Sequence, residues 1–303
     1  MPLCIVPDFS PNNYSEIRDV EIFQNPLTQK IFEPGSVFKP ITMAGALNEQ
    51  KLTPQTTYLD TGEVKIGGWK ITNYDNRIWG QKTMTEVLEM SINTGAVFAE
   101  KQLGHQSFLE YVEKFGFFEK TGIDLQGEVF SENKEFKKGY EINFATASFG
   151  QGIEITPIQL ARAFSAIANG GKLVTPYILE GKPPQNSETQ VISQSTASQL
   201  TAMLVSVIEN GFSKKAKIEG YFIAGKTGTS QMPWPALGVQ RSGYSSKTWQ
   251  SFIGFAPAFN PEFLILVKLD NPQRRTAEYS AMPIFRDLAK YIIDYWEIPP
   301  DYE

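Results

Sequence analysis

Apolar residues recur at helical spacing through the middle of the chain and form short continuous or alternating runs in its final third. In the middle, capping residues precede several of the periodic stretches and glycines follow them, as is typical of helix starts and ends. The pattern predicts helices over residues 36–47, 83–90, 93–103, 107–116, 156–167 and 195–208. We expect these helices to form one compact block.

The final third has a strand pattern, with strands predicted over residues 221–229, 248–255 and 263–269. No helix separates these strands, so antiparallel pairing is expected. A helix predicted over 284–296 can cover one face of the sheet. The segment 231–247, which contains several Pro and Gly residues, is predicted to be a mobile loop. Core positions are predicted at Phe252, Phe255, Phe263, Tyr291 and Trp296.

The composition excludes several classes of function. The chain has 303 residues, a formal net charge of −5 and no basic run, so a nucleic-acid partner is not expected. Cys4 is the only cysteine and His105 the only histidine, which argues against a disulfide, a zinc site and a Ser-His-Asp triad. We expect no metal and no cofactor. No stretch approaches the roughly 20 apolar residues of a membrane helix, and the first residues lack the pattern of a signal peptide.

Ser36 and Lys39 carry the strongest chemical signal. Residues three apart on a helix have Cβ atoms roughly 5–6 Å apart, so the hydroxyl and the amine can lie side by side. A lysine shielded from water holds its proton less tightly and can accept the serine's, which would make Ser36 a nucleophile. The Pro-Gly pair before Ser36 favours a helix start, where free N–H groups stabilise a developing oxyanion. Ser131 and Lys134 have the same spacing but lie in a charged, loop-like stretch.

Two further motifs supply possible partners for the serine. Ser91 and Asn93 lie where one predicted helix ends and the next begins, a position that can direct a hydroxyl and an amide into a cleft. Lys226, Thr227 and Gly228 lie at the end of an apolar strand, where the lysine adds a fixed charge and the glycine lets a substrate backbone approach closely. Further copies of these patterns occur at residues 10–12, 131–133 and 120–122.

The ordered set of Ser-x-x-Lys, Ser-x-Asn and Lys-Thr-Gly resembles the motif set of penicillin-recognising serine enzymes. Almost the whole chain resembles the transpeptidase domain of class B penicillin-binding proteins, the monofunctional enzymes that cross-link bacterial peptidoglycan. The supporting stretches are SPNNY at 10–14, EPGS at 33–36, ATASFGQG at 145–152, TPIQLA at 156–161, GFAP at 254–257 and AMPIF at 281–285. The Lys-Thr-Gly copy at 120–122 resembles a structural turn of such proteins.

The resemblance implies an α+β fold of the β-lactamase/transpeptidase type, with an antiparallel sheet flanked by helices and an all-helical subdomain. A single catalytic domain over 1–303 would have its sheet subdomain at about 1–35 and 215–303 and its helical subdomain at about 36–214. Class B proteins begin with a membrane anchor and a pedestal domain, neither of which this sequence contains, so we expect a partial chain. Its native place would be the extracytoplasmic face of the bacterial membrane.

The resemblance also implies catalytic roles. Ser36 would attack the carbonyl between the last two D-alanines of a donor stem peptide, and Lys39 would accept its proton. Ser91 would relay a proton to the leaving D-alanine. Asn93 would bind the donor's amide backbone and help to fix Lys39. Lys226 would keep the site positive and orient Ser91.

Substrate-binding roles follow from the same resemblance. Thr227 and Thr229 would bind the terminal carboxylate of the donor, and Gly228 would allow the close approach of its backbone. The backbone N–H groups of Ser36 and Thr229 would form the oxyanion hole, in which the loss of one donor typically costs roughly 2.7–4 kcal/mol of barrier.

The expected partners are stem peptides ending in D-Ala-D-Ala, β-lactams as covalent inhibitors, and a membrane glycosyltransferase reached through the missing N-terminal region. A D,D-carboxypeptidase and a β-lactamase-like hydrolase are alternatives within the resemblance. The hydrolase lacks support, because no convincing Glu-x-x-x-Asn loop follows the Ser-x-Asn motif. A β-lactam sensor or division scaffold without turnover is the alternative from another class.

Overall fold

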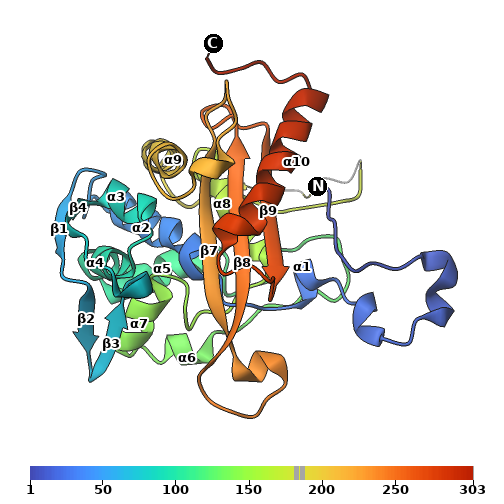
Figure 1. Ribbon diagram of the computed structural model, residues 1–303, viewed down its shortest axis with the longest axis horizontal. Coiled ribbons are helices and arrows are strands. Elements are labelled where there is room, and N and C mark those ends of the chain that lie inside the picture. The colour runs from blue at the N-terminus through green and yellow to red at the C-terminus, as the bar shows by residue number, and fades with distance from the viewer. Residues whose placement is uncertain (181–183, 185–187, 303) are drawn as a thin grey trace.

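An antiparallel sheet runs through the middle of the molecule, with α10 on one face and helices on the other (Figure 1). The computed structural model describes residues 1–180, 184 and 188–302. The sheet contains β7 (Ala224–Pro233), β8 (Tyr244–Ala256) and β9 (Phe263–Asp270), in the order β7-β8-β9. The central strand β8 is buried continuously from Trp249 onward, as expected for a strand covered on both faces. The predicted antiparallel pairing is confirmed.

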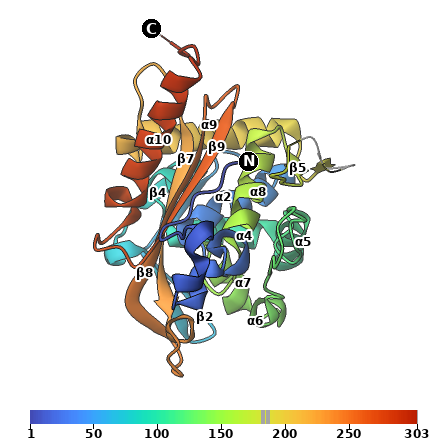
Figure 2. The same ribbon diagram turned by 90° about the vertical axis from the view of Figure 1, so that its right-hand side faces the viewer.

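Helix α10 (Ala281–Tyr295) covers one face of this sheet, as the sequence predicted (Figure 2). Phe285 on its inner side is fully buried, and its ring centroid lies 4.4 Å from that of Phe252 on β8. Tyr291 and Trp296 are instead 64% and 54% exposed. Their prediction as core was wrong, because an amphipathic helix buries only the stripe that faces the sheet.

The opposite face of the sheet packs against α8 (Pro157–Ala168) and α9 (Gln194–Glu209) (Figure 2). Beside them lies α2 (Lys39–Asn48), which is buried at every position from Lys39 to Leu47. After Lys39, residues 40–47 are apolar or small on all sides, which suits a helix surrounded by other elements. At Gly45 an added Cβ would lie 2.8 Å from a methyl group of Leu103, so the close packing of α2 requires this glycine.

The remaining helices pack around α2 and its neighbours. Their bounds are α1 (Pro26–Gln29), α3 (Met84–Glu89), α4 (Asn93–Leu103), α5 (His105–Lys114), α6 (Lys134–Lys137) and α7 (Glu141–Ala147). The predicted helices that correspond to α3, α4, α8 and α9 are confirmed to within two residues. Helix α5 begins two residues earlier than predicted, because Gly104, at φ 89°, ends α4 and lets the next helix start at once.

Short antiparallel ribbons, which the sequence analysis did not predict, complete the fold. They pair β1 (Thr57–Asp60) with β4 (Gly80–Thr83), β2 (Glu63–Ile66) with β3 (Trp69–Thr72), and β5 (Lys172–Val174) with β6 (Glu188–Gln190). Strands of three or four residues are too short to show a hydrophobic period. The positions of these ribbons therefore depend on tertiary contacts and not on a local sequence pattern.

The hairpin between β7 and β8 is longer than predicted. Pairing continues from Gln231 with Thr248 to Pro233 with Tyr244, so the two ends of the predicted loop 231–247 belong to strands. The tip contains the 3-10 helix η6 (Trp234–Leu237). The prediction of a loop over the whole segment was wrong, because its Pro and Gly residues concentrate near the tip.

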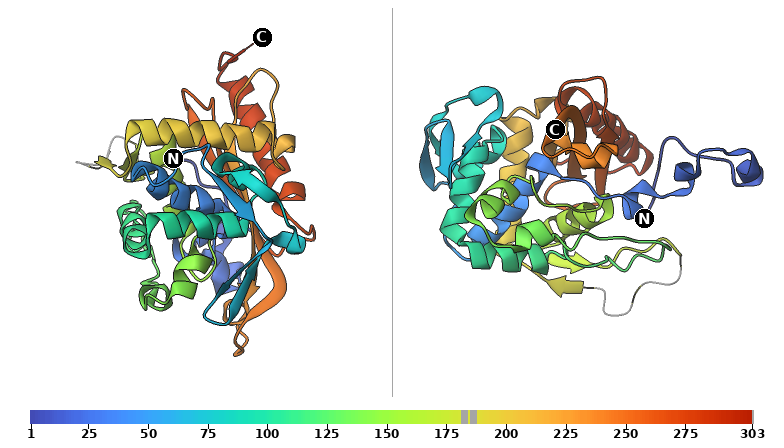
Figure 3. Two further views of the ribbon diagram at one scale, coloured as in Figure 1. Left: turned by 90° about the vertical axis from the view of Figure 1, so that its left-hand side faces the viewer. Right: turned by 90° about the horizontal axis from the view of Figure 1, so that it is seen from below.

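The first 35 residues, all of which the structure describes, add no strand to the sheet. They form the 3-10 helices η1 (Pro11–Glu16) and η2 (Val20–Phe23), followed by α1, and this segment extends away from the body (Figure 3, right). The chain then joins the body through a β-bridge between Phe32 and Ile155. This bridge leads directly into the segment that carries Ser36.

We predict that Phe285→Ala lowers the free energy of unfolding by about 3–5 kcal/mol, because it removes a fully buried ring between α10 and the sheet. Leu288→Ala is the matched control, since Leu288 lies on the same helix but is 44% exposed; its expected cost is below about 1 kcal/mol. Urea denaturation of both variants measures these values. Equal losses would show that α10 does not cover the sheet as described.

Candidate active site

Ser36 lies in the 3-10 helix η3 (Gly35–Phe38), and Lys39 is the first residue of α2. The Nζ atom of Lys39 lies 3.0 Å from Oγ of Ser36. Val37 and Phe38, between them, are fully buried and anchor this turn in the core. The three-residue spacing thus brings the hydroxyl and the amine into hydrogen-bonding distance.

Ser91 lies in the turn between α3 and α4, with φ 54°, and Asn93 opens α4. The Lys39 amine lies 2.6 Å from the carbonyl oxygen of Ser91 and 3.2 Å from its Oγ. It also donates to Oδ1 of Asn93 at 2.8 Å. The left-handed backbone of Ser91, uncommon for a residue other than glycine, directs both its carbonyl and its hydroxyl toward the same amine.

Lys226 reaches the same group of side chains from β7. Its Nζ atom lies 3.0 Å from Oγ of Ser91 and 3.2 Å from the carbonyl oxygen of Thr227. Ser91 therefore lies between the two lysine amines. The sequence predicted a strand over 221–229, with Lys226 toward its end. In the structure β7 begins at Ala224, so Lys226 lies near its start, where it pairs with Ile253.

Thr227 and Thr229 face the same cavity, but Gly228 is not among its lining residues. A Cβ added at Gly228 would lie 2.7 Å from Oγ of Ser251 and 2.9 Å from the carbonyl oxygen of Pro34. The glycine thus lets β7 pack against the segment that carries Ser36. The hydroxyl of Thr229 accepts a hydrogen bond from the backbone N–H of Ala277 at 3.2 Å, so its own proton is free for another acceptor.

The cavity has a volume of about 900 Å³ and contains Ser36, Ser91 and Asn93 in its lining. Most of its walls come from η3, the segment 72–79, the α3–α4 turn, β7 and the segment 271–279 that follows β9, with further lining residues at Phe149, Gln151, Phe212, Ser246 and Thr248. The sequence analysis identified the first, third and fourth of these segments. It missed the segments 72–79 and 271–279, which carry no motif of their own.

Burial changes the acid–base behaviour of both lysines, which are each only 1% exposed. It lowers the pKa of Lys39 well below the usual lysine value, and the nearby Lys226 lowers it further. Burial also lowers the pKa of Lys226, to about 7. In the described part of the chain, the hydrogen-bond partners of both amines are hydroxyl, amide and carbonyl oxygens and include no carboxylate. The neutral amine, the form that can accept a proton, is therefore favoured at Lys39.

A buried polar network fixes the turn that carries Ser91 and Asn93. Asp60, 2% exposed, accepts hydrogen bonds from Oγ1 of Thr94 at 2.6 Å and from Nδ2 of Asn73 at 2.9 Å. The Oδ1 atom of Asn73 in turn accepts from the backbone N–H of Thr94 at 3.2 Å. Asn93 donates to the carbonyl oxygen of Thr72 at 3.0 Å. The sequence analysis did not identify Asp60, because its partners lie far apart in the chain.

The Ser36 turn is held from the other side by Glu33 and Gly150. The carbonyl oxygen of Glu33 accepts a hydrogen bond from Ser230 on β7 at 2.6 Å, and its carboxyl accepts one from Tyr244 on β8 at 3.0 Å. Burial raises the pKa of the Glu33 carboxyl to about 7, although the Tyr244 hydrogen bond opposes this rise. The N–H of Gly35 donates to the carbonyl oxygen of Gly150 at 2.9 Å. The turn is thereby joined to both the sheet and the helical block.

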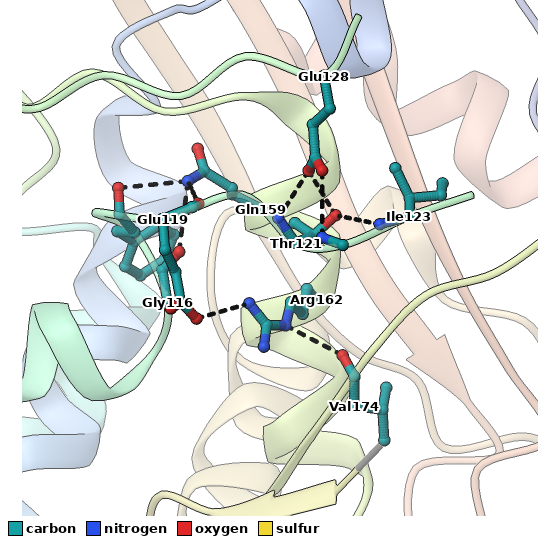
Figure 4. A network of polar contacts seen from close by, with 10 residues as sticks. Gly116, Glu119, Thr121, Ile123, Glu128, Gln159, Arg162 and Val174 are labelled. Carbon is teal, nitrogen blue, oxygen red and sulfur yellow. Dashed lines mark hydrogen bonds and ion pairs between the residues drawn. The ribbon is translucent and has the colours of Figure 1, made fainter. Parts of the chain in front are cut away.

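The other copies of the motifs lie elsewhere and serve local structure. Thr121 donates through its backbone N–H and its hydroxyl to the buried Glu128, at 2.7 and 2.6 Å (Figure 4). In the same network, Gln159 donates to the carbonyl oxygen of Glu119 at 2.7 Å. Ser131 donates to Glu154 at 2.8 Å, and Lys134 pairs with Glu132 at 3.0 Å. Residues 10–12 lie in the exposed start of η1 and its cap.

Within the described residues, no group of three or more His, Cys, Asp and Glu side chains is arranged to hold a metal ion. The described helices include none with the length and apolar character needed to cross a membrane. The lone His105 pairs with Glu100 at 2.6 Å and stacks on Phe144, remote from the Ser36 cavity lining.

A serine and a lysine at the start of a buried helix, opposite a strand of an antiparallel sheet, are the arrangement of the penicillin-recognising α+β fold. The family described as penicillin-binding protein transpeptidase domain matches residues 5–290. The chain belongs to this family. The resemblance to class B penicillin-binding proteins is confirmed.

Known proteins support this assignment in sequence and in structure. Stage V sporulation protein D of Bacillus subtilis is 38% identical over 88% of this chain and 42% of its own length. Peptidoglycan D,D-transpeptidase FtsI of Escherichia coli is 30% identical over 97% of this chain and 49% of its own length. The chain thus spans about half the length of these relatives.

Among solved structures, the transpeptidase domain of Burkholderia pseudomallei penicillin-binding protein 3 is 28% identical with a TM-score of 0.82, covering 92% of this chain and 84% of that one. Penicillin-binding protein 3 of Mycobacterium tuberculosis, complexed with aztreonam, is also 28% identical with a TM-score of 0.82, covering 91% of this chain and 65% of that one. The similarity therefore extends over both the sheet and the helical block.

We predict that Gly150→Ala destabilises the fold by more than about 3 kcal/mol. Gly150 has φ 81°, and a Cβ there would lie 2.1 Å from the carbonyl oxygen of Gly35, so a clash adds to the roughly 1–2 kcal/mol cost of a left-handed backbone. Gly139→Ala is the control, because Gly139 has φ 77° and open space around its Cα. Urea denaturation compares the two. Equal stability of both variants would contradict the tight contact with Gly35.

Proposed function

We propose that this chain is a serine-type D,D-transpeptidase that cross-links peptidoglycan stem peptides through an acyl-enzyme on Ser36. The observation that carries the proposal is the distance of 3.0 Å between Oγ of Ser36 and Nζ of Lys39, in an environment that lowers the lysine pKa. A neutral amine at this distance can serve as the general base for the hydroxyl. The family and the names of the relatives support the same activity.

In the acylation step, Oγ of Ser36 attacks the carbonyl carbon between the last two D-alanines of the donor, and its proton passes to Lys39. The tetrahedral intermediate then loses the terminal D-alanine as the C–N bond breaks. Ser91, 3.2 Å from Nζ of Lys39, carries a proton from the lysine to the leaving nitrogen. An ester between Ser36 and the shortened donor remains.

In the second step, the amine of another stem peptide attacks this ester. The acceptor nitrogen loses a proton through Ser91 and Lys39, Ser36 recovers its hydroxyl proton, and a new peptide bond joins the two stems. Asn93, whose Oδ1 lies 2.8 Å from Nζ of Lys39, holds the base in place through both steps. Water in place of the acceptor amine would give carboxypeptidase activity instead.

The positive end of the cavity suits the carboxylate at the end of the donor. Thr227 and Thr229 line the cavity beside the buried Lys226, and the hydroxyl proton of Thr229 is free to donate. Gly228 allows the close approach of the donor backbone to β7, and it also lets β7 pack closely against the serine turn. The backbone N–H groups of Ser36 and Thr229 are assigned to the oxyanion hole, where preorganised donors stabilise the developing charge.

A β-lactam would take the donor's place and acylate Ser36, with slow hydrolysis thereafter. The names of the family and of its aztreonam-bound member support this part of the proposal. We further propose that the domain works at the extracytoplasmic face of the bacterial membrane, as part of a longer anchored protein that acts together with a membrane glycosyltransferase.

Incubation of the purified protein with donor and acceptor stem peptides tests the activity. We expect a cross-linked dimer and released D-alanine, both abolished by Ser36→Ala. Release of D-alanine without a cross-linked dimer would show that the protein is a carboxypeptidase and not a transpeptidase. Labelling by a fluorescent penicillin without any peptide product would favour a sensor or scaffold. Equal labelling of the wild type and Ser36→Ala would contradict the assigned nucleophile.

The pH dependence of penicillin acylation tests the coupling between the two lysines. The rate should fall as the pH is lowered and Lys39 takes up a proton. Burial is the main cause of the lowered pKa of Lys39 and Lys226 lowers it further, so Lys226→Ala should raise that pKa and move the fall in rate to higher pH. Lys226→Arg keeps the charge and is the control. Stopped-flow acylation rates across the pH range give the midpoints, and an unchanged midpoint in Lys226→Ala would contradict the coupling.

A further inference from the structure

Arg77 lines the same cavity as Ser36 and Ser91, yet the proposed reaction does not use it. It lies between β3 and β4, and its side chain is 46% exposed. Its Cζ atom is 5.8 Å from the ring centroid of Trp79 and 5.5 Å from that of Phe212. Cation–π attraction to the two rings favours this position of the guanidinium on the cavity wall.

The N–H groups of this guanidinium are available for a ligand. In the part of the chain that the structure describes, Arg77 has a single ion-pair partner, Asp75, at 4.0 Å, which is beyond hydrogen-bonding distance. Asp75 pairs more closely with Arg275, at 2.9 Å. A guanidinium carries five N–H donors in a planar arrangement that fits a carboxylate through two parallel hydrogen bonds.

The backbone on both sides of Arg77 is fixed by one buried carboxylate. The carbonyl oxygen of Arg77 accepts a hydrogen bond from Nδ2 of Asn73 at 3.0 Å, and Asn73 also donates to Asp60. The N–H of Trp79 donates to Oδ2 of Asp60 at 2.8 Å. The arginine is thus held in position before any ligand arrives, which reduces the entropy lost on binding.

We propose that Arg77 binds a carboxylate of the stem peptide upstream of its D-Ala-D-Ala end. The inference rests on the proposed function, which assigns the terminal carboxylate to Lys226, Thr227 and Thr229 on β7. Arg77 comes from a different segment of the cavity lining and serves a second anion. A volume of about 900 Å³ lies at the upper end of the range for ligand sites and accommodates residues upstream of the two D-alanines.

Binding of three synthetic stem pentapeptides to Ser36→Ala protein, which cannot turn them over, tests this proposal. The first peptide has isoglutamine at its second residue and lysine at its third, so its only carboxylate is the terminal one. The second peptide replaces isoglutamine by isoglutamate. The third replaces lysine by diaminopimelate, which keeps the side-chain amine and adds one carboxylate. Isothermal titration gives a dissociation constant for each.

Arg77→Gln, introduced into the Ser36→Ala protein, should weaken binding of at least one peptide with an upstream carboxylate by about tenfold, and that of the first peptide by less than about twofold. Arg286→Gln is the matched control, because it removes the same charge from the exposed side of α10 and should leave all three constants unchanged. Arg77→Lys keeps the charge but not the planar donor pair, and should weaken the same peptide selectively by a smaller factor.

Equal weakening of all three peptides in Arg77→Gln, or no weakening of any, would overturn the proposal. If Arg77→Gln unfolds, Arg77→Lys supplies the same test, because it should selectively lose affinity for a peptide with an upstream carboxylate. If Arg77→Lys shows no such selective loss, the proposal is overturned. Penicillin acylation of the protein that retains Ser36 is measured separately. Failure of that reaction counts against the proposed function, whereas failure of the carboxylate selectivity counts against the role of Arg77 alone.

Discussion

The contact between the Lys39 amine and the Ser36 hydroxyl determines which groups the rest of the site must place around that amine. An amine that is 1% exposed is stable there only if it is neutral or surrounded by acceptors, because burial disfavours its charge. The protein supplies oxygen atoms from Ser36, Ser91 and Asn93 instead of a carboxylate. A carboxylate would stabilise the charged form and remove the base that the proposed mechanism requires.

This condition explains why segments far apart in the chain must meet around α2. The Ser91 turn reaches Lys39 because Asp60 binds both Thr94 and Asn73 in a buried network. The Ser36 turn is fixed by the contact between Gly35 and Gly150 and by the hydrogen bond from Ser230 to the Glu33 backbone. Such buried networks act cooperatively, since removal of one member leaves other polar groups without partners. The position of the amine therefore depends on residues that never touch it.

The sequence was informative where chemistry and local periodicity coincide. The helix spacing predicted the approach of Ser36 and Lys39, and the interhelical position of Ser91 followed from the helix ends at residues 90 and 93. Asp60 ends the four-residue strand β1, and its partners Asn73, Trp79 and Thr94 lie in other segments, so no periodic pattern indicates the contact. The same holds for Arg77, whose significance comes from the rings of Trp79 and Phe212. The sequence predicts that Gly228 lets a substrate backbone approach, and the structure adds that a Cβ at Gly228 would also meet the backbone of Pro34, a contact that no motif indicates.

Two buried lysines with lowered pKa values also make folding depend on pH. The pKa of Lys226 falls from 10.5 to about 7 on folding, so between these values the unfolded chain binds more protons than the folded one. Stability should therefore increase as the pH rises from about 7 toward 10.5, and the full penalty, on the order of 5 kcal/mol, applies below about pH 7. Lys39 contributes in the same direction. The carboxyl of Glu33, whose pKa burial raises to about 7, acts in the opposite sense, because the unfolded state ionises more readily at neutral pH. For Glu33 the folded state binds more protons between about pH 4.5 and 7, so stability falls as the pH rises through that window. Near pH 7 the penalties of Glu33 and the two lysines therefore add, and the large apolar core around α2 and the sheet must offset them.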